Sequence, residues 1–202
     1  MSPATATTTP TTKERILDAA EEIMLQKSFH SVGLNEILSA VKVPKGSFYH
    51  YFQSKEQFGV ELLKHYVAEA SAHKRRALLT TELSEDPFER LMVYWDLNIA
   101  KMMDSGSPCS CLVVKLASEV ATFSDDMRAV LADGIREWTG YLEKVILEGQ
   151  ARGTIRKEID AKVTAMTIHD LWMGASQRMQ LERSVAPLRA ATLFIRHYLS
   201  PA

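Results

Sequence analysis

The stretch 44–56 reads PKGSFYHYFQSKE, and it decides how the N-terminal third of the chain is expected to fold. Pro44 suits the entry of a helix but not its interior, so we predict a short helix over Lys45–Tyr51. Ser54 is typical of a cap that opens the next helix, which the apolar pattern continues towards Leu79. Two helices therefore meet within this single stretch.

Two further helices are predicted before it. An amphipathic helix follows Thr12, with apolar residues at helical spacing from Ile16 to Met24. A short helix over Leu34–Ala40 comes next, and the segment Val41–Pro44 breaks it. Two short helices joined by a four-residue turn and braced by a longer helix form a helix-turn-helix unit.

The rest of the chain keeps helical periodicity, and no alternating strand pattern is long enough to compete with it. Five more helices are predicted, opening at Pro87, Pro108, Ser124, Glu158 and Ala186. The predicted fold class is all-α. We expect a flexible arm over 1–12, a helix-turn-helix domain over 13–54, and a helical regulatory and dimerisation domain over 55–202.

Composition limits the possible classes of protein. The chain has 202 residues and a formal net charge of -1, so any contact with nucleic acid must come from a local basic face. No apolar run is long enough to span a bilayer, and the Thr/Ala/Pro-rich start lacks the pattern of a secretory signal. The only two cysteines, Cys109 and Cys111, are too close together to form a disulfide framework. A cytoplasmic protein without a membrane partner is expected.

A basic face of this kind follows from the opening stretch. Between Ile37 and Lys55 there are three lysines and no acidic residue, which suits a surface that lies against phosphate. Gly46 allows a close approach of the backbone to the duplex. The cap of the preceding short helix is Gly33, which has no hydroxyl to bond phosphate, and the side chain of Asn35 can partly take the place of that hydroxyl. The aromatic residues Phe48 and Phe52 are expected to be core. The candidate contacts to double-stranded DNA are Asn35, Lys45, Gly46, Ser47, Tyr49, His50 and Lys55.

The same stretch resembles the signature of the TetR family of transcriptional regulators, over about Lys13 to Leu63. The resemblance implies a homodimeric repressor with each recognition helix in the major groove of a palindromic operator. It also implies that the last two helices pair with their copies as a four-helix bundle. Gly174 and Ala175 would permit close approach there, and a stripe through Leu188, Ala191, Phe194 or Ile195, and Tyr198 would form the contact.

The C-terminal part is rich in methionine and tryptophan. Such residues are more often core filler than a ligand site, but adaptable Met and aromatic walls also suit apolar ligands. The residues expected to line a pocket are Trp95, Met102, Met166 and Trp172.

The two thiols lie in the run SPCSCLVVK, residues 107–115. If Ser107 caps and Pro108 opens a helix, both thiols lie near its first turn, where backbone N–H groups favour a thiolate. Lys115 adds positive potential on the same face as Cys111. The alternative is that each thiol is a small buried hydrophobe.

A narrower resemblance covers most of the chain and points to the N-ethylmaleimide-responsive, NemR-like branch of the TetR family. Besides residues 43–60, the shared sequence includes Cys111-Leu112 with Val114-Lys115-Leu116, and later segments around Trp172 and Pro187. In that branch the cysteine before the leucine is the sensing thiol, which implies Cys111 here, with Cys109 as an extra thiol. It also implies release from DNA by an electrophile or oxidant, and control of detoxification genes.

Other readings stay open. A repressor of the multidrug type would be released by an apolar ligand without covalent chemistry. A Cys-dependent enzyme would need a general base near Cys111, and the nearest downstream histidine is His169. A metal would need ligands beyond the two thiols, such as His65, His73 or His169. We expect no enzyme activity, no cofactor and no metal.

Overall fold

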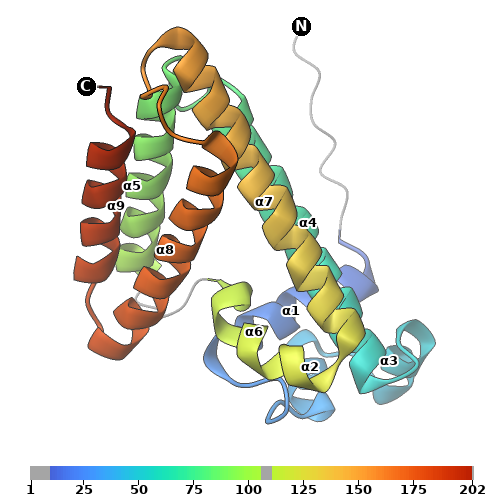
Figure 1. Ribbon diagram of the computed structural model, residues 1–202. Helices are drawn as coiled ribbons and strands as arrows, with labels where there is room; N and C mark the ends of the chain where they lie inside the picture. Colours follow the sequence, from blue (N-terminus) through green and yellow to red (C-terminus); the bar gives the residue numbers. More distant parts are fainter. Residues whose placement is uncertain (1–9, 106–110, 202) are drawn as a thin grey trace, which may run out of the picture.

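The computed structural model describes residues 10–105 and 111–201, and within these ranges the chain forms helices and connecting segments without a β-strand (Figure 1). The all-α prediction is therefore confirmed. The helices in the described ranges are α1 (Thr12–Gln26), α2 (Leu34–Val41), α3 (Lys45–Tyr51), α4 (Lys55–Leu79), α5 (Pro87–Ser105), α6 (Leu112–Phe123), α7 (Asp125–Arg152), α8 (Ala161–Glu182) and α9 (Ala186–Leu199).

Side-chain caps set several helix starts. Thr11 and Glu14 form a reciprocal capping box at α1. The hydroxyl of Ser54 accepts from the backbone N–H of Gln57 at the start of α4, and Ser124 caps α7 in the same way. These starts agree with the sequence prediction.

Two predicted starts were wrong by about one turn. Cys111 has φ -133° and ψ 113°, which is extended backbone, so α6 begins at Leu112 rather than at Pro108. α8 begins at Ala161 rather than at Glu158, because Asp160 accepts a 2.8 Å hydrogen bond from the N–H of Val163 and caps the helix there.

The first three helices enclose a core that α4 completes. Ile16 and Met24 of α1, Ile37 of α2, and Phe48 and Phe52 around α3 are each no more than 2% exposed. The core role predicted for the two phenylalanines is confirmed. Arg15 adds a polar brace, since its guanidinium donates a 2.9 Å hydrogen bond to the Val41 carbonyl at the end of α2.

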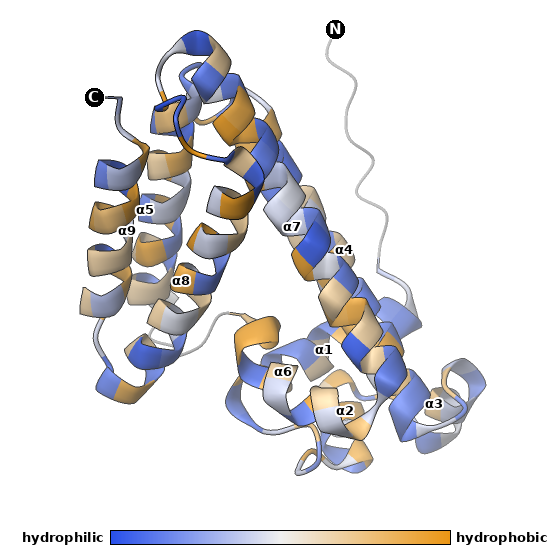
Figure 2. Cartoon of the chain, viewed as in Figure 1, coloured by the Kyte–Doolittle hydropathy of each residue, from blue (hydrophilic) through white to orange (hydrophobic). Residues whose placement is uncertain are grey.

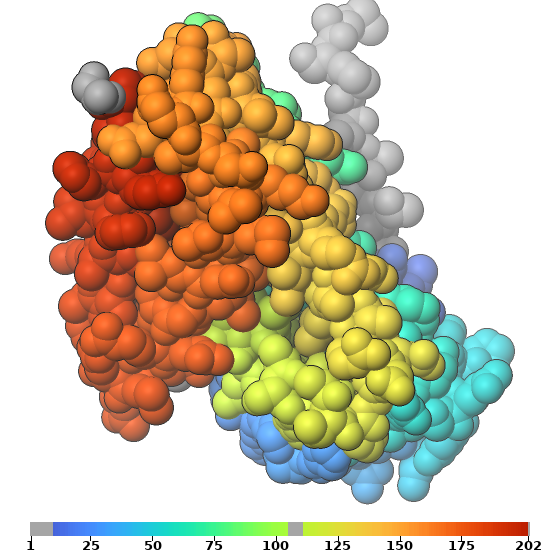
Figure 3. Space-filling view, viewed as in Figure 1, coloured from blue at the N-terminus to red at the C-terminus, as the bar shows by residue number. Residues whose placement is uncertain are grey.

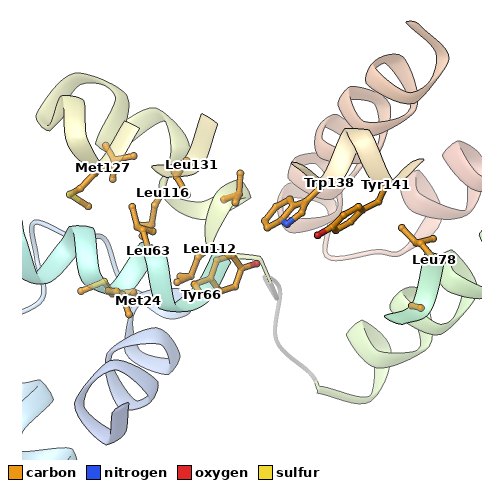
Figure 4. Packing of buried hydrophobic residues seen from close by; sticks show 14 of the residues in the cluster. Met24, Leu63, Tyr66, Leu78, Leu112, Leu116, Met127, Leu131, Trp138 and Tyr141 are labelled. Carbon is orange, nitrogen blue, oxygen red and sulfur yellow. The ribbon is translucent and has the colours of Figure 1, made fainter. Parts of the chain in front are cut away.

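Helices α4 and α7 run side by side along the molecule and connect its two ends (Figure 1). Their approach is close at Gly134, where an added Cβ would lie 2.9 Å from a methyl carbon of Val67. Figure 4 shows Leu63 of α4 and Leu116 of α6 in one packed group with Met127 and Leu131 of α7. The apolar core is thus continuous from the N-terminal unit into the rest of the chain.

Helices α5, α8 and α9 form a second group beside the upper part of α7 (Figure 1). The buried Arg90 of α5 pairs with Glu148 of α7 and also donates to the Ser84 carbonyl at 3.2 Å. A small core of Ile99, Ala175, Met179, Leu188 and Ala191 joins α5, α8 and α9.

Helix α6 fills the space between these groups. Its surface lies between the N-terminal helices and α8 in the space-filling view (Figure 3). Leu112, Val113 and Leu116 are fully buried, so the first turns of α6 are anchored in the core. None of the described helices combines the length and apolarity required to cross a bilayer.

Candidate DNA-binding surface and thiol cavity

Helix α3 presents one face to the core and the other to solvent. Phe48 is 2% exposed, whereas its neighbour Tyr49 is 57% exposed and His50 is also exposed. A tyrosine hydroxyl and an imidazole that face solvent can form hydrogen bonds with a partner. Tyr49 and His50 therefore have the accessibility that a base- or phosphate-contacting residue needs.

The turn between α2 and α3 and the start of α3 carry two positive charges, those of Lys42 and Lys45. Lys42 has φ 55°, a left-handed conformation that ends α2 and redirects the chain into α3. Asn35, Lys42 and Lys45 line the same shallow hollow, and all three are exposed. Gly46 is exposed and Ser47 is half-buried. Of the predicted contact residues, Asn35 and Lys45 thus lie at one exposed basic hollow, and the others follow Lys45 along α3 and at the start of α4.

Lys55, also exposed, makes contacts within the chain that the sequence did not predict. Its Nζ donates to the backbone carbonyls of His30 at 3.2 Å and Val32 at 3.0 Å, and lies 5.2 Å from the ring centre of Phe29. In this structure the ammonium braces the loop between α1 and α2, and its contact with phosphate stays a prediction.

Cys111 lies at the N-cap of α6, not within the first turn of a helix as expected. Its side chain is half-buried, and the hydroxyl of Tyr66 donates a hydrogen bond to Sγ at 3.3 Å. Burial raises the pKa of Tyr66 well above its ordinary value, and the neighbouring thiol raises it further, so this hydroxyl stays a proton donor. Cys109, with Ser107 and Pro108, lies outside the described residues.

Cys111 is also part of a cavity wall. The cavity has a volume of about 110 Å³ and lies among α4, α5, α7, α8 and the start of α6. Figure 4 shows Tyr66 beside Leu112, with Trp138 on the facing helix. Three predicted pocket residues, Trp95, Met102 and Trp172, line this cavity.

Met166 does not line the cavity. It is 51% exposed and contributes to a separate surface hollow between α7 and α8, because its position on α8 points away from α4 and α5. Sequence reasoning missed the contribution of α4, notably Tyr66 and Lys74, since nothing in the spacing of the chain links that helix to Cys111.

The described residues give Cys111 no metal-binding surroundings. The one group of three possible ligands found in the described ranges is Asp18, His65 and Glu69, and it does not include the thiol. His65 Nε2 lies 2.8 Å from Asp18 Oδ1, so this group is adequately explained as a hydrogen-bonded contact between α1 and α4.

A second unexpected contact joins α6 to the N-terminal unit. The carboxylate of Glu119 accepts from the backbone N–H groups of Phe29 at 3.0 Å and His30 at 2.8 Å, and lies 2.5 Å from His30 Nδ1. Burial favours a higher pKa for Glu119, but the hydrogen bonds from His30 and Phe29 outweigh it and lower the pKa overall. Phe123 packs against both rings of the same loop. The loop before α2 is thus held by Glu119 on one side and Lys55 on the other.

Comparison with known families places this arrangement in a class. Residues 16–62 match the model described as bacterial regulatory proteins, tetR family, and residues 87–195 match the tetracyclin repressor-like, C-terminal domain. The chain belongs to the TetR family, whose members are DNA-binding transcription regulators and not enzymes.

Individual relatives narrow the class. The chain is 33% identical to the transcriptional repressor NemR of Escherichia coli K12 over 190 residues, covering 94% of each protein. It is also 33% identical to the transcriptional regulator AcuR of Cereibacter sphaeroides over 188 residues, which is 93% of this chain and 85% of AcuR. The crystal structure of reduced Escherichia coli NemR superposes with a TM-score of 0.86 at 31% identity, covering 95% of this chain and all of that one. The predicted resemblance to NemR-like repressors is confirmed.

Proposed function

We propose that this chain is a homodimeric repressor that binds a palindromic operator and is released when an electrophile or oxidant modifies Cys111. The genes it controls would encode enzymes that detoxify such compounds. The observation that carries the proposal is the position of Cys111, half-buried in a cavity wall with a tyrosine hydroxyl 3.3 Å from its sulfur.

Operator binding is supported by the basic surface of α2 and α3. Asn35, Lys45, Tyr49 and His50 are exposed there, and no acidic residue lies between Ile37 and Lys55 to repel phosphate. Two such surfaces in a dimer would read two half-sites about one helical turn apart.

Dimerisation through the last two helices is supported by their uncovered apolar residues. Leu193 is 69% exposed and Phe194 is 56% exposed, and the hydropathy colouring shows orange residues along α8 and α9 (Figure 2). The stripe expected from the sequence needs correction, because Leu188, Ala191 and Ile195 pack within the chain. The proposed contact is formed by residues exposed on α8 and α9: Val163, Met166, Leu181, Leu193, Phe194 and Tyr198.

The chemical step is addition of the thiolate to an activated double bond, with N-ethylmaleimide as the probe. Sγ forms a bond to one alkene carbon, the π pair moves to form an enolate, and the other carbon then takes a proton from water. The donor hydroxyl of Tyr66 stabilises negative charge on sulfur before the attack. No acceptor for a proton, such as a histidine, is required once the thiolate is present.

The adduct would be transmitted through α6. A cavity of about 110 Å³ cannot hold a substituted maleimide without movement of its wall, and Cys111 is the residue that opens α6. Glu119, two turns further along α6, holds the backbone of the loop before α2. Movement of α6 would therefore disturb the position of the DNA-binding unit.

The test is an operator-shift assay with DNA from upstream of the gene, with and without N-ethylmaleimide. The native chain should bind and be released by the reagent. Cys111→Ser should bind with similar affinity and resist release, whereas the matched variant Cys109→Ser should still be released. Release that persists in Cys111→Ser would contradict covalent sensing and support an effector that acts by occupying the cavity.

A further inference from the structure

The cavity beside Cys111 has an unusual combination of walls. Its aromatic residues include all three tryptophans of the chain, Trp95, Trp138 and Trp172, together with Tyr66 and Tyr94. Within this apolar surround lies one ammonium group, Lys74 Nζ, which is 4.2 Å from the ring centre of Trp138. A ligand for this site must suit both a flat aromatic surface and a positive charge.

The positive charge is not balanced locally. Among the described residues that line the cavity there is no Asp or Glu, and Lys74 forms no ion pair with a described residue. Lys74 is half-buried, and its contact with Trp138 is a cation–π interaction that offers no hydrogen-bond acceptor, so no described residue accepts a hydrogen bond from its N–H donors. An anion in the cavity would supply that acceptor.

A second polar group on the wall is also incompletely satisfied. His169 Nδ1 is buried without a hydrogen-bond partner among the described residues, and a carboxylate oxygen of Asp170 lies 3.6 Å away. Burial lowers the pKa of His169, and Lys74 lowers it further against the opposing effect of Asp170. The imidazole is therefore neutral near pH 7 and has one N–H to donate.

Size and access limit the ligand further. An apolar cavity of about 150 Å³ is known to bind benzene, so about 110 Å³ corresponds to a body of at most one ring. A wider hollow of about 600 Å³ adjoins the cavity and shares Lys74, Tyr94 and Asn98 with it. Its walls carry Arg76 and Lys101 but also Glu21, Glu69 and Glu82. Lys74 stands where the two spaces meet, and there a charged end of a ligand can stay partly hydrated.

We propose that this cavity binds a small organic anion with a flat, unsaturated or aromatic body, whose carboxylate pairs with Lys74 while the body lies among the tryptophans. Its role as an effector rests on the proposed repressor function, but its binding does not. Such a ligand needs no covalent bond to Cys111, so it would be a second kind of signal at the same site.

The test uses intrinsic tryptophan fluorescence of the full chain, because every tryptophan lines the cavity. Benzoate is the probe, and benzamide is its neutral counterpart of the same shape. Benzoate should change the fluorescence saturably and at concentrations at least about tenfold lower than benzamide, as expected for a charged hydrogen bond. Equal binding of the two probes, or no saturable change with either, would overturn the proposal.

Variants separate the ionic contact from the fold. Lys74→Met should weaken benzoate binding about tenfold or more, and Lys74→Arg should retain most of it. The matched control Lys144→Met removes an exposed lysine of α7 that does not line the cavity, and it should leave binding unchanged. Undiminished benzoate binding by Lys74→Met, folded by circular dichroism, would also overturn the proposal. If Cys111→Ser binds benzoate normally but N-ethylmaleimide still releases its operator, the covalent function fails while the anion site stands.

Discussion

The N-terminal unit and the C-terminal half use aromatic residues in opposite ways. Around α3 the rings of Phe48, Phe52 and Phe58 pack directly on one another, with centroids 4.9–5.3 Å apart. In the C-terminal half Trp95 and Trp172 lie 6.2 Å apart and surround a cavity instead of filling it. Close-packed rings fix one geometry, whereas rings around a void can rearrange when the void is occupied. The first arrangement suits reading DNA, and the second suits sensing a small molecule.

The contrast between the two regions depends most on the assignment of Tyr49 and His50 to the DNA-binding surface. Tyr49→Ala combined with His50→Ala should lower operator affinity about a thousandfold, since each lost contact costs about 1–3 kcal/mol and a dimer loses two sets. Thermal unfolding should be nearly unchanged, because both side chains are exposed. Fluorescence anisotropy with labelled operator measures the affinity, and Gln53→Ala is an exposed control. Near-native binding by the double variant would remove these two residues from the interface.

Stability in the C-terminal half should depend on a polar pair more than on any exposed charge. Arg90→Met removes a buried partner of Glu148, which keeps its ion pair with the exposed Arg152, and also removes the hydrogen bond to the Ser84 carbonyl, so it should lower the free energy of unfolding by about 2 kcal/mol. Arg136→Met removes an exposed pair with Asp133 and should change the free energy of unfolding by less than about 0.5 kcal/mol. Urea denaturation followed by circular dichroism measures both. Equal effects from the two substitutions would mean that the buried position of Arg90 does not increase its contribution to the free energy of unfolding.

The hydroxyl of Tyr66, beside the Cys111 thiol, allows a test of the proposed sensing function. Tyr66→Phe keeps the ring but removes the donor to Cys111, so modification by N-ethylmaleimide should slow about fivefold near pH 7, for a hydrogen bond of about 1 kcal/mol. Rates can be followed by mass spectrometry in a Cys109→Ser background. The matched variant Tyr94→Phe changes another cavity tyrosine and should react at the native rate. An unchanged rate in Tyr66→Phe would show that the hydroxyl does not assist.

The smallest effect concerns the contact between the two regions. The pKa of Glu119 is lowered in the folded chain, so its stabilising contribution is present above the unfolded value near 4.3 and is lost as pH falls through the folded pKa. Glu119→Gln should cost less than about 1 kcal/mol at pH 7 and should reduce the acid sensitivity of unfolding. It should also weaken the release of DNA by N-ethylmaleimide.

The exposed carboxylate of Glu158, which forms no ion pair with a described residue, gives the control for this effect. Glu158→Gln should alter neither the pH profile of unfolding nor the response to the reagent. If Glu119→Gln is released as readily as the native chain, α6 does not act through this contact.

The sequence was sufficient for several helix starts that local chemistry decides, although the cap of Asp160, which sets the start of α8, was missed. Pro44, Ser54 and Ser124 mark helix starts because proline geometry and hydroxyl caps act within a few residues. Contacts between distant residues could not be predicted in this way. The bond between Tyr66 and Cys111 spans 45 positions, and that between His30 and Glu119 spans 89. No periodicity encodes either bond, since both depend on how whole helices pack.

Helix α4 begins at Lys55, directly after the recognition helix, and its far part contributes Leu78 to the cavity wall. Its 25 residues correspond to a rod of about 37 Å. A tilt of about 5° at the cavity end would therefore shift the other end by about 3 Å, close to the rise of one base pair. In a dimer with two such rods, a change smaller than the width of one ligand would put the half-site spacing out of register with the operator.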